Sequence, residues 1–169
     1  MFHQIGPERP VGGLSPLSAL PDRGEIEQAI ARWEQAVEAS PAQFEARYNL
    51  ASQYLERGRL DDAIRLLEQA ARLAPNHETL HVRLGRAYME QGRGEDAYRA
   101  LTLVRRLYPD NWFAPLGLAV LFATTERPDE ARPLLEEAFR LGGDVARSTA
   151  AGYPALAPLL ARASAPPSP

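Results

Sequence analysis

The segment from His77 to His81 carries residue types that could do catalysis, since it reads His-Glu-Thr-Leu-His. On a helix, two histidines at this spacing can hold a zinc ion while the glutamate activates a metal-bound water, as in zinc peptidases. Such a site needs a third ligand, and the remaining histidine of the chain is His3, near its start. We therefore keep a zinc peptidase as a remote alternative. We expect His77 to lie in a turn and His81 to be partly packed on a helix.

Composition excludes several other kinds of chemistry. The chain has 169 residues, with 19 Lys and Arg against 22 Asp and Glu, and a formal charge of −3. The absence of cysteine excludes disulfides, thiolate metal sites and cysteine nucleophiles, and the mild negative charge gives no reason to expect nucleic acid. No apolar run is long enough to cross a bilayer and the start does not resemble a secretory signal. We expect a cytoplasmic protein without membrane insertion, cofactor, metal or catalytic residues.

The elements that position these residues follow from a repeat of 34 residues in the sequence. Apolar residues recur three and four apart, which is typical of amphipathic helices, and strand-like alternation is absent. Shifting the chain by one period superimposes residues of the same size or type, without a gap. The matched sets are Leu50, Leu84 and Leu118; Ala51, Gly85 and Ala119; Tyr54, Tyr88 and Phe122; Ala63, Ala97 and Ala131; Leu67, Leu101 and Leu135; and Ala70, Val104 and Ala138. One such unit cannot bury its apolar face alone, so the pattern predicts stacked units.

At these positions the chain resembles the tetratricopeptide repeat (TPR) family, whose unit is a pair of antiparallel helices, A and B. The resemblance covers full repeats at 44–77, 78–111 and 112–145, and a half repeat at 24–43 that supplies only a B helix. It implies an all-α fold: a right-handed α-solenoid of about three and a half helix pairs with a C-terminal capping helix. The family's fourth position, usually large and apolar, is different here, being Arg47, His81 and Pro115.

The chain divides into four parts. We expect a flexible lead rich in Pro and Gly over 1–23, the repeat array over 24–143, a C-terminal cap over 144–163, and a disordered tail over 164–169. The predicted helices lie at about 24–40, 44–57, 60–74, 78–91, 94–107, 112–125, 128–141 and 154–163. Pro133, inside the seventh of these, predicts a bend.

In this family the A helices line a concave groove, and the resemblance implies a non-catalytic protein-interaction module or scaffold that binds a partner segment there. Carrying the groove positions of the family over to this chain predicts the following partner-binding residues: Glu45, Tyr48, Asn49, Ser52, Arg83, Arg86, Met89, Phe113, Leu116 and Val120. The middle of this groove is amide and cationic, and its far end is apolar.

Two points about this groove stay open at the level of sequence. Arg83 and Arg86 can recognise an anionic or carboxylate-terminated peptide, or they can pair with Glu45, Glu56 or Glu90 across the groove. The apolar end can be covered by the 154–163 helix or by a second copy of the chain. If a second copy stacks there, or on the half repeat at the front, the protein is a self-assembling scaffold, which is the main alternative function.

Overall fold

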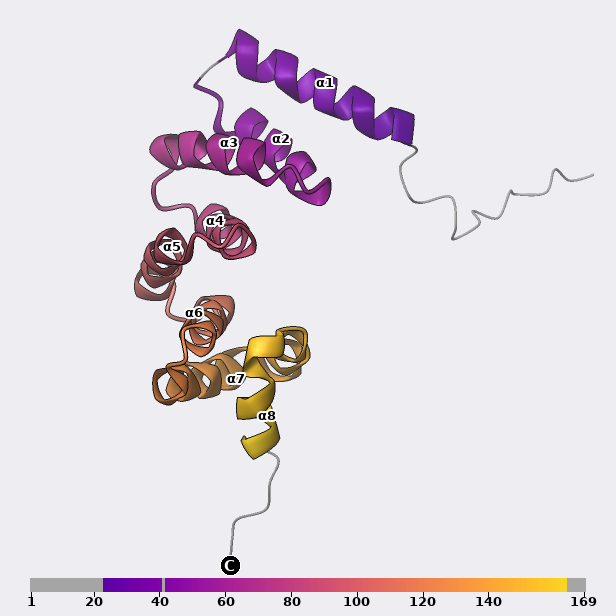
Figure 1. The fold of residues 1–169 in the computed structure, drawn as a ribbon. Coiled ribbons are helices and arrows are strands. Elements are labelled where there is room, and N and C mark those ends of the chain that lie inside the picture. The colour runs from indigo at the N-terminus through magenta and orange to yellow at the C-terminus, as the bar shows by residue number, and fades with distance from the viewer. Residues whose placement is uncertain (1–22, 41, 164–169) are drawn as a thin grey trace, which may run out of the picture.

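A computed structural model describes residues 23–40 and 42–163, and in these residues every regular element is helical (Figure 1). The elements are α1 (Arg23–Ala39), α2 (Phe44–Glu56), α3 (Leu60–Leu73), α4 (Glu78–Glu90), α5 (Gly94–Leu107), α6 (Phe113–Thr124), α7 (Pro128–Ala151), the 3₁₀ turn η1 (Pro154–Leu156) and α8 (Ala157–Ala163). The lead expected over 1–23, apart from Arg23, and the tail expected over 164–169 lie outside the described residues.

The helices stack in chain order from α1, in indigo, to α8, in yellow (Figure 1). The most extensive contacts join α2 with α3, α4 with α5 and α6 with α7, which are the A and B helices of the three repeats. Smaller contacts join each repeat to the next, through α3 with α4 and α5 with α6. The all-α solenoid predicted from sequence is therefore confirmed, and its core is continuous because each pair covers its neighbour.

A leucine of each B helix fills the space between the helices of a pair. Leu67 and Leu101 are 0% exposed and Leu135 is 4% exposed. Leu101 lies so close to α4 and α6 that a Cβ added at Gly85 would stand 2.8 Å from its Cγ, and one at Gly117 would stand 2.7 Å from its Cδ1. The missing side chains at Gly85 and Gly117 are thus what allows Leu101 to fit.

The turn between the helices of each pair needs a residue in the left-handed backbone region. Gly58 has φ of 71° and Gly92 has φ of 76°, a conformation that glycine adopts without a steric cost. In the third repeat Glu126 adopts φ of 57° at the same place. The same turn geometry therefore forms in all three repeats, at the cost of some backbone strain at Glu126.

The residues that depart from the family pattern at its fourth position are buried all the same. Arg47 is 9% exposed, and its Nε donates a hydrogen bond of 3.1 Å to Oε1 of Gln69. His81 is 8% exposed, with Nε2 at 2.6 Å from the Pro75 carbonyl oxygen. Each polar side chain thus has a partner inside the stack, which is the condition for burying it.

The C-terminal cap begins inside α7, where the chain changes direction. The backbone leaves the helical region at Gly143, with φ of 52° and ψ of −132°, whereas Pro133 keeps helical angles. The sharp change of direction is therefore at Gly143, where glycine tolerates a positive φ, and the bend expected at Pro133 stays a prediction. A Cβ at the preceding Gly142 would stand 2.6 Å from Cγ of Trp112, so this corner also packs tightly on the start of α6.

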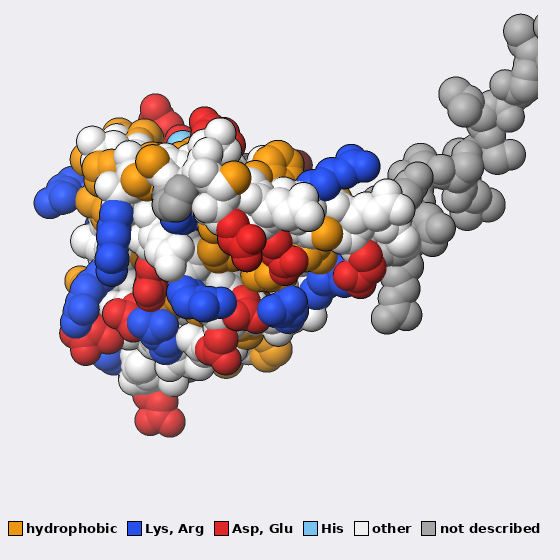
Figure 2. Space-filling model, turned by 90° about the horizontal axis from the view of Figure 1, so that it is seen from above, with side chains coloured by type: hydrophobic (Ala, Val, Ile, Leu, Met, Phe, Trp, Pro, Cys, Tyr) orange, Lys and Arg blue, Asp and Glu red, His pale blue; other side chains and the backbone are white. Residues whose placement is uncertain are grey.

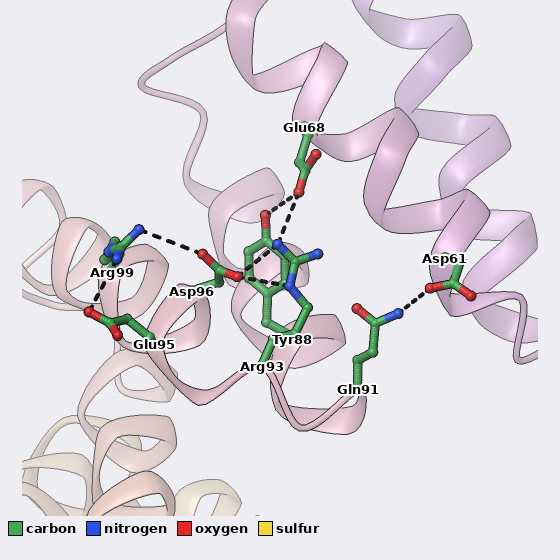
Figure 3. A network of polar contacts seen from close by, with 8 residues as sticks. All are labelled: Asp61, Glu68, Tyr88, Gln91, Arg93, Glu95, Asp96 and Arg99. Atoms are coloured by element: carbon green, nitrogen blue, oxygen red, sulfur yellow. Dashed lines mark hydrogen bonds and ion pairs between the residues drawn. The ribbon is translucent and has the colours of Figure 1, made fainter.

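A polar network joins consecutive repeats (Figure 3). The hydroxyl of Tyr88 on α4 donates a hydrogen bond of 2.8 Å to Glu68 on α3, and Arg93 lies 4.5 Å from the centre of the Tyr88 ring. Asp96 holds Arg93 in place through an ion pair of 2.7 Å. Burial, and after it the hydrogen bond to Glu68, raise the pKa of Tyr88, because both disfavour the phenolate.

The same network recurs one repeat earlier. The Tyr54 hydroxyl donates a hydrogen bond of 2.6 Å to Glu34, and Arg59 lies 4.0 Å from the Tyr54 ring. Burial and the contact with Glu34 raise the pKa of Tyr54 as well. In the third repeat Phe122 lacks the hydroxyl, and the residue one period after Glu68 is Thr102. The third repeat therefore lacks both the tyrosine hydroxyl that donates this hydrogen bond and the carboxylate that accepts it.

Packing around Leu101 leads to a prediction about the two glycines. We expect Gly85→Ala and Gly117→Ala each to lower the free energy of unfolding by about 1 kcal/mol, since Leu101 can shift toward the remaining glycine. The double variant should lose clearly more than the sum, because Leu101 then has no direction in which to move. Urea unfolding followed by circular dichroism measures this. Gly94→Ala, where a Cβ meets nothing within 4 Å, is the matched control. An additive or stabilising double variant would contradict the packing described.

The raised pKa values of Tyr54 and Tyr88 predict a loss of stability in alkali. Above about pH 10, unfolded tyrosine releases its proton while the native side chains keep theirs, so the free energy of unfolding falls as pH rises. The double variant Tyr54→Phe and Tyr88→Phe should show a shallower fall between about pH 9 and about pH 11. Tyr98→Phe, at an exposed ring, should keep the steep fall. The measurement is the urea unfolding midpoint of wild type and both variants across this pH range. If the midpoint falls equally steeply with pH in all three proteins, the role of the network is refuted.

Candidate functional site

Tyr48 and Arg83 meet in the middle of the predicted groove, one on α2 and one on α4. Nε of Arg83 donates a hydrogen bond of 2.8 Å to the Tyr48 hydroxyl. The guanidinium carbon of Arg83 also lies 5.2 Å from the centre of the Tyr48 ring. This combined contact holds the cation of Arg83 in one place beside an aromatic ring, so less side-chain entropy is lost when it binds an anion.

Tyr48 packs in an aromatic cluster with Phe44 and His77. The ring of Phe44 stacks on Tyr48 with centroids 5.5 Å apart, and His77 lies 4.8 Å from Phe44 and 5.6 Å from Tyr48. Phe44 begins α2 and His77 begins the next repeat. Because three rings pack together, Tyr48 cannot easily swing away, and the position of Arg83 depends on this cluster.

Arg86 lies one turn after Arg83 on α4, is exposed, and extends over the ring of Phe113 at 5.6 Å from its centre. Within residues 23–40 and 42–163, no carboxylate forms an ion pair with Arg83 or Arg86. Pairing with Glu45, Glu56 or Glu90, which the sequence left open, is not what the structure shows. Two guanidinium groups are thus held by aromatic rings on the groove side of α4 with their charge available.

The remaining predicted residues of α2 contribute less. Glu45 is exposed, and Asn49 is half-buried without a described contact to either arginine. The hydroxyl of Ser52 donates to the Tyr48 carbonyl oxygen of its own helix, at 2.9 Å. In the described residues, Arg83 and Arg86 thus contact aromatic side chains, and not the Asn49 amide.

The apolar end of the groove is closed by the chain itself. Leu116 is 0% exposed, Val120 is 6% exposed and Phe113 is 7% exposed. They share one core with Leu156 and Leu159, and η1 packs against α6. Of the two coverings that the sequence left open, the structure shows the first: the C-terminal segment packs against Phe113, Leu116 and Val120, so these side chains are buried and do not form an exposed apolar wall.

A cavity of about 860 Å³ opens where the groove meets this covered end. Three predicted groove residues line it, namely Arg86, Met89 and Val120. Its apolar walls also include Tyr98, Leu121, Phe122 and Tyr153, while Glu90, Glu95, Arg127 and Glu130 supply charge. Arg127 and Glu130 neutralise each other through an ion pair. The volume lies within the range of small-ligand and side-chain pockets.

Sequence reasoning missed Phe44 and Tyr153 as contributors to this region. Phe44 stands at the first position of its repeat, and its link to His77 crosses a repeat boundary. Tyr153 follows the last repeat, so the 34-residue period assigns it no position. Only the folding back of the cap after Gly143 brings it to the cavity.

The two histidines of the zinc-like segment have other partners. Nδ1 of His77 accepts a hydrogen bond of 3.2 Å from the Leu80 amide, which caps the start of α4. Nε2 of His81 lies against the Pro75 carbonyl oxygen. In the described part of the chain, no three side chains of His, Cys, Asp or Glu come together in a group that could hold a metal ion. The geometry therefore gives the segment a structural role at the repeat junction.

The charged surface is mixed. Figure 2, which looks down the stack from the α1 end, shows basic and acidic side chains next to one another on that face. The ion pairs of the chain include Arg57 with Glu27 at 2.7 Å and Arg59 with Asp62 at 2.6 Å. Exposed pairs of this kind contribute little to stability.

Comparison with known proteins agrees with this architecture. Two sequence profiles described as tetratricopeptide repeat match the chain, one at residues 18–78 and the other at residues 54–112. Together they span more than half of it. The chain belongs to the tetratricopeptide repeat family. Repeats of this family generally form non-catalytic scaffolds for protein–protein interaction. No curated protein sequence matches the chain.

Solved structures give the same fold. The crystal structure of MamA has a TM-score of 0.67 and 21% identity, covering 85% of this chain and 94% of that one. The MamA MSR-1 structure has a TM-score of 0.64 and 22% identity, covering 70% of this chain and 68% of that one. The Pseudomonas aeruginosa pilF structure has a TM-score of 0.62 and 24% identity, covering 71% of this chain and 55% of that one. At these identities the likeness supports the TPR solenoid and says nothing of partners.

None of the helices in the described residues combines the length and apolarity needed to span a bilayer.

The capping role of His77 is testable. We expect His77→Ala to lower the free energy of unfolding by about 1 kcal/mol, because the Leu80 amide loses its acceptor, whereas His77→Asn should retain most of the stability. Thermal and urea unfolding measure both. Added Zn²⁺ should shift neither wild type nor variants. A zinc-dependent rise in the wild-type midpoint that His77→Ala abolishes would instead support a metal site.

Proposed function

We propose that this TPR protein is a non-catalytic scaffold that holds a partner's acidic segment across α2 and α4. The observation that carries the proposal is the pair Arg83 and Arg86, held against Tyr48 and Phe113 without a carboxylate partner in the described residues. Arginine forks recognise carboxylates through paired hydrogen bonds, and this recognition does not require a covalent or redox step.

Preorganisation supports the choice of this surface. A flexible arginine loses side-chain entropy when it binds, but Arg83 is already held by the Tyr48 hydroxyl and ring. The aromatic cluster of Phe44, Tyr48 and His77 keeps that contact in place. A carboxylate can therefore bind to Arg83 and Arg86 with a smaller entropy loss than at isolated surface arginines.

The neighbouring cavity adds selectivity for an apolar side chain. Arg86 and Met89 line it on the groove side, and Val120, Phe122 and Tyr153 form apolar walls. Glu90 lies in the same wall and disfavours a second carboxylate at that point. The favoured segment thus has acidic residues over Arg83 and Arg86 and a large apolar or aromatic residue entering the cavity.

The alternative function, self-assembly, has less support, because one of the two surfaces proposed for it is covered. It required an open apolar end or the half repeat at the front, and the apolar end is filled by Leu156 and Leu159 of the same chain. Stacking on α1 stays a prediction. The binding of a separate partner in the groove has more support from the geometry.

The proposal predicts salt-dependent binding of an acidic peptide. The probe is a fluorescein-labelled peptide, Glu-Glu-Leu-Phe-Glu, with a free carboxyl end. We expect the double variant Arg83→Gln and Arg86→Gln to weaken binding at least about tenfold in fluorescence anisotropy, because two charge-assisted contacts are lost. Wild-type affinity should fall as salt rises from about 50 mM to about 500 mM.

The matched control is the double variant Arg72→Gln and Arg106→Gln, which changes the net charge equally at exposed positions of α3 and α5. It should weaken binding by less than about threefold, the effect of overall charge alone. An equal loss in both double variants, or a wild type that does not bind, would refute recognition by Arg83 and Arg86.

A further inference from the structure

A second cavity of about 520 Å³ lies in the C-terminal cap, away from the groove. Residues of α7 on both sides of Gly143, together with Leu159 of α8, line it. It exists because the chain changes direction at Gly143, which lets the end of α7 and α8 face the earlier part of α7. The repeat pattern does not require this cavity.

Three arginines surround this cavity: Arg132, Arg140 and Arg147. All three are exposed, and the acidic residue that lines the cavity with them is Glu136. In residues 23–40 and 42–163, none of the three forms an ion pair with a carboxylate. Three cations against one anion give the cavity a positive charge in a chain whose formal charge is −3.

Several other exposed arginines of the solenoid do form ion pairs. Arg105 binds Glu137 on the neighbouring B helix at 2.7 Å. Arg93 and Arg99 are held by Asp96 and Glu95 in the network of Figure 3. Near the cap, Glu136 lines the same cavity, yet it forms no ion pair with the three cavity arginines, which keep their charge available.

The floor of the cavity is apolar, and a ring contact orients one of the arginines at its edge. Leu135 is 4% exposed and Leu159 is 7% exposed. The guanidinium of Arg147 lies 4.5 Å from the centre of the Phe139 ring, which orients it at the edge of the cavity. A ligand that fits must therefore offer carboxylates at the rim and an apolar group above Leu135 and Phe139.

From this arrangement we propose that the cap cavity is a second docking site, for an acidic segment of a partner protein that carries an apolar side chain between its carboxylates. Charge complementarity selects the acidic residues, and the exposed rim suits a surface segment. The site is formed by α7 and α8 alone, so it does not depend on the groove between α2 and α4. The protein can then hold two acidic segments at once, which would make it a bridging scaffold.

The test uses the full chain with the groove arginines already replaced, Arg83→Gln and Arg86→Gln, so that the remaining binding, at least about tenfold weaker than that of wild type, reports on the cap. The probe is a fluorescein-labelled peptide, Glu-Glu-Leu-Phe-Glu-Glu, with acetylated and amidated ends. In this background we expect Arg140→Gln and Arg147→Gln to weaken binding at least about tenfold in fluorescence anisotropy. Arg132→Gln with Arg140→Gln, which leaves the contact between Arg147 and Phe139 intact, should weaken it similarly.

The matched control in the same background is Arg72→Gln with Arg106→Gln. Arg106 stands one period and Arg72 two periods before Arg140, each on its own B helix, and their replacement should change affinity by less than about threefold. The proposal is overturned if the background protein does not bind the peptide or if the control weakens binding as much as the cap variants. It is also overturned if the protein binds vesicles of phosphatidylserine through these arginines but not the peptide. Circular dichroism of each variant must match wild type.

Discussion

The close approach of each A helix to the leucine of the facing B helix is the constraint on which this molecule depends. Leu67, Leu101 and Leu135 are buried within the pairs, and Gly85 leaves the room that Leu101 needs. Ala51 and Ala119 are the small residues at the same repeat position. Once this spacing is set, α2, α4 and α6 must stand side by side. The groove residues Tyr48 on α2 and Arg83 on α4 are then brought into contact although 35 positions separate them.

Departures from the repeat pattern are where this chain acquires its particular properties. Phe122 replaces the tyrosine of earlier repeats, and its ring becomes a wall of the large cavity instead of a donor to the preceding B helix. The break at Gly143 ends the regular stack, closes the apolar end over Leu116 and forms the cap cavity. Regular positions thus supply the frame and the candidate groove arginines, and irregular ones shape the two cavities.

The frame could be predicted from sequence because it depends on local periodicity. The bounds predicted for the helices from α2 to α6 lie within about one residue of those observed, since Gly58, Gly92 and the repeated alanines mark the same points in each unit. The candidate groove residues Arg83, Arg86 and Met89 could be chosen by their position in the repeat. The contacts of the two arginines could not be predicted in this way, because the Tyr48 hydroxyl beside Arg83 and the Phe113 ring beside Arg86 come from neighbouring repeats.

The cap could not be derived from the period, because the sequence gives no signal for which way the chain runs after Gly143. Pro133 was the stronger local signal for a bend, yet it keeps helical angles near the start of α7. Tyr153 reaches the large cavity, and Leu156 covers α6, only through long-range packing. For the same reason Phe113, Leu116 and Val120 could not be identified as buried from their repeat positions alone.

Amide hydrogen exchange measured with and without a bound acidic peptide tests most directly whether the concave face carries the function. We expect added protection in α2 and α4, strongest around Tyr48 and from Arg83 to Met89, with the outer faces of α3 and α5 unchanged. Protection confined to α3 and α5, or spread evenly over the stack, would contradict a binding groove formed by the A helices.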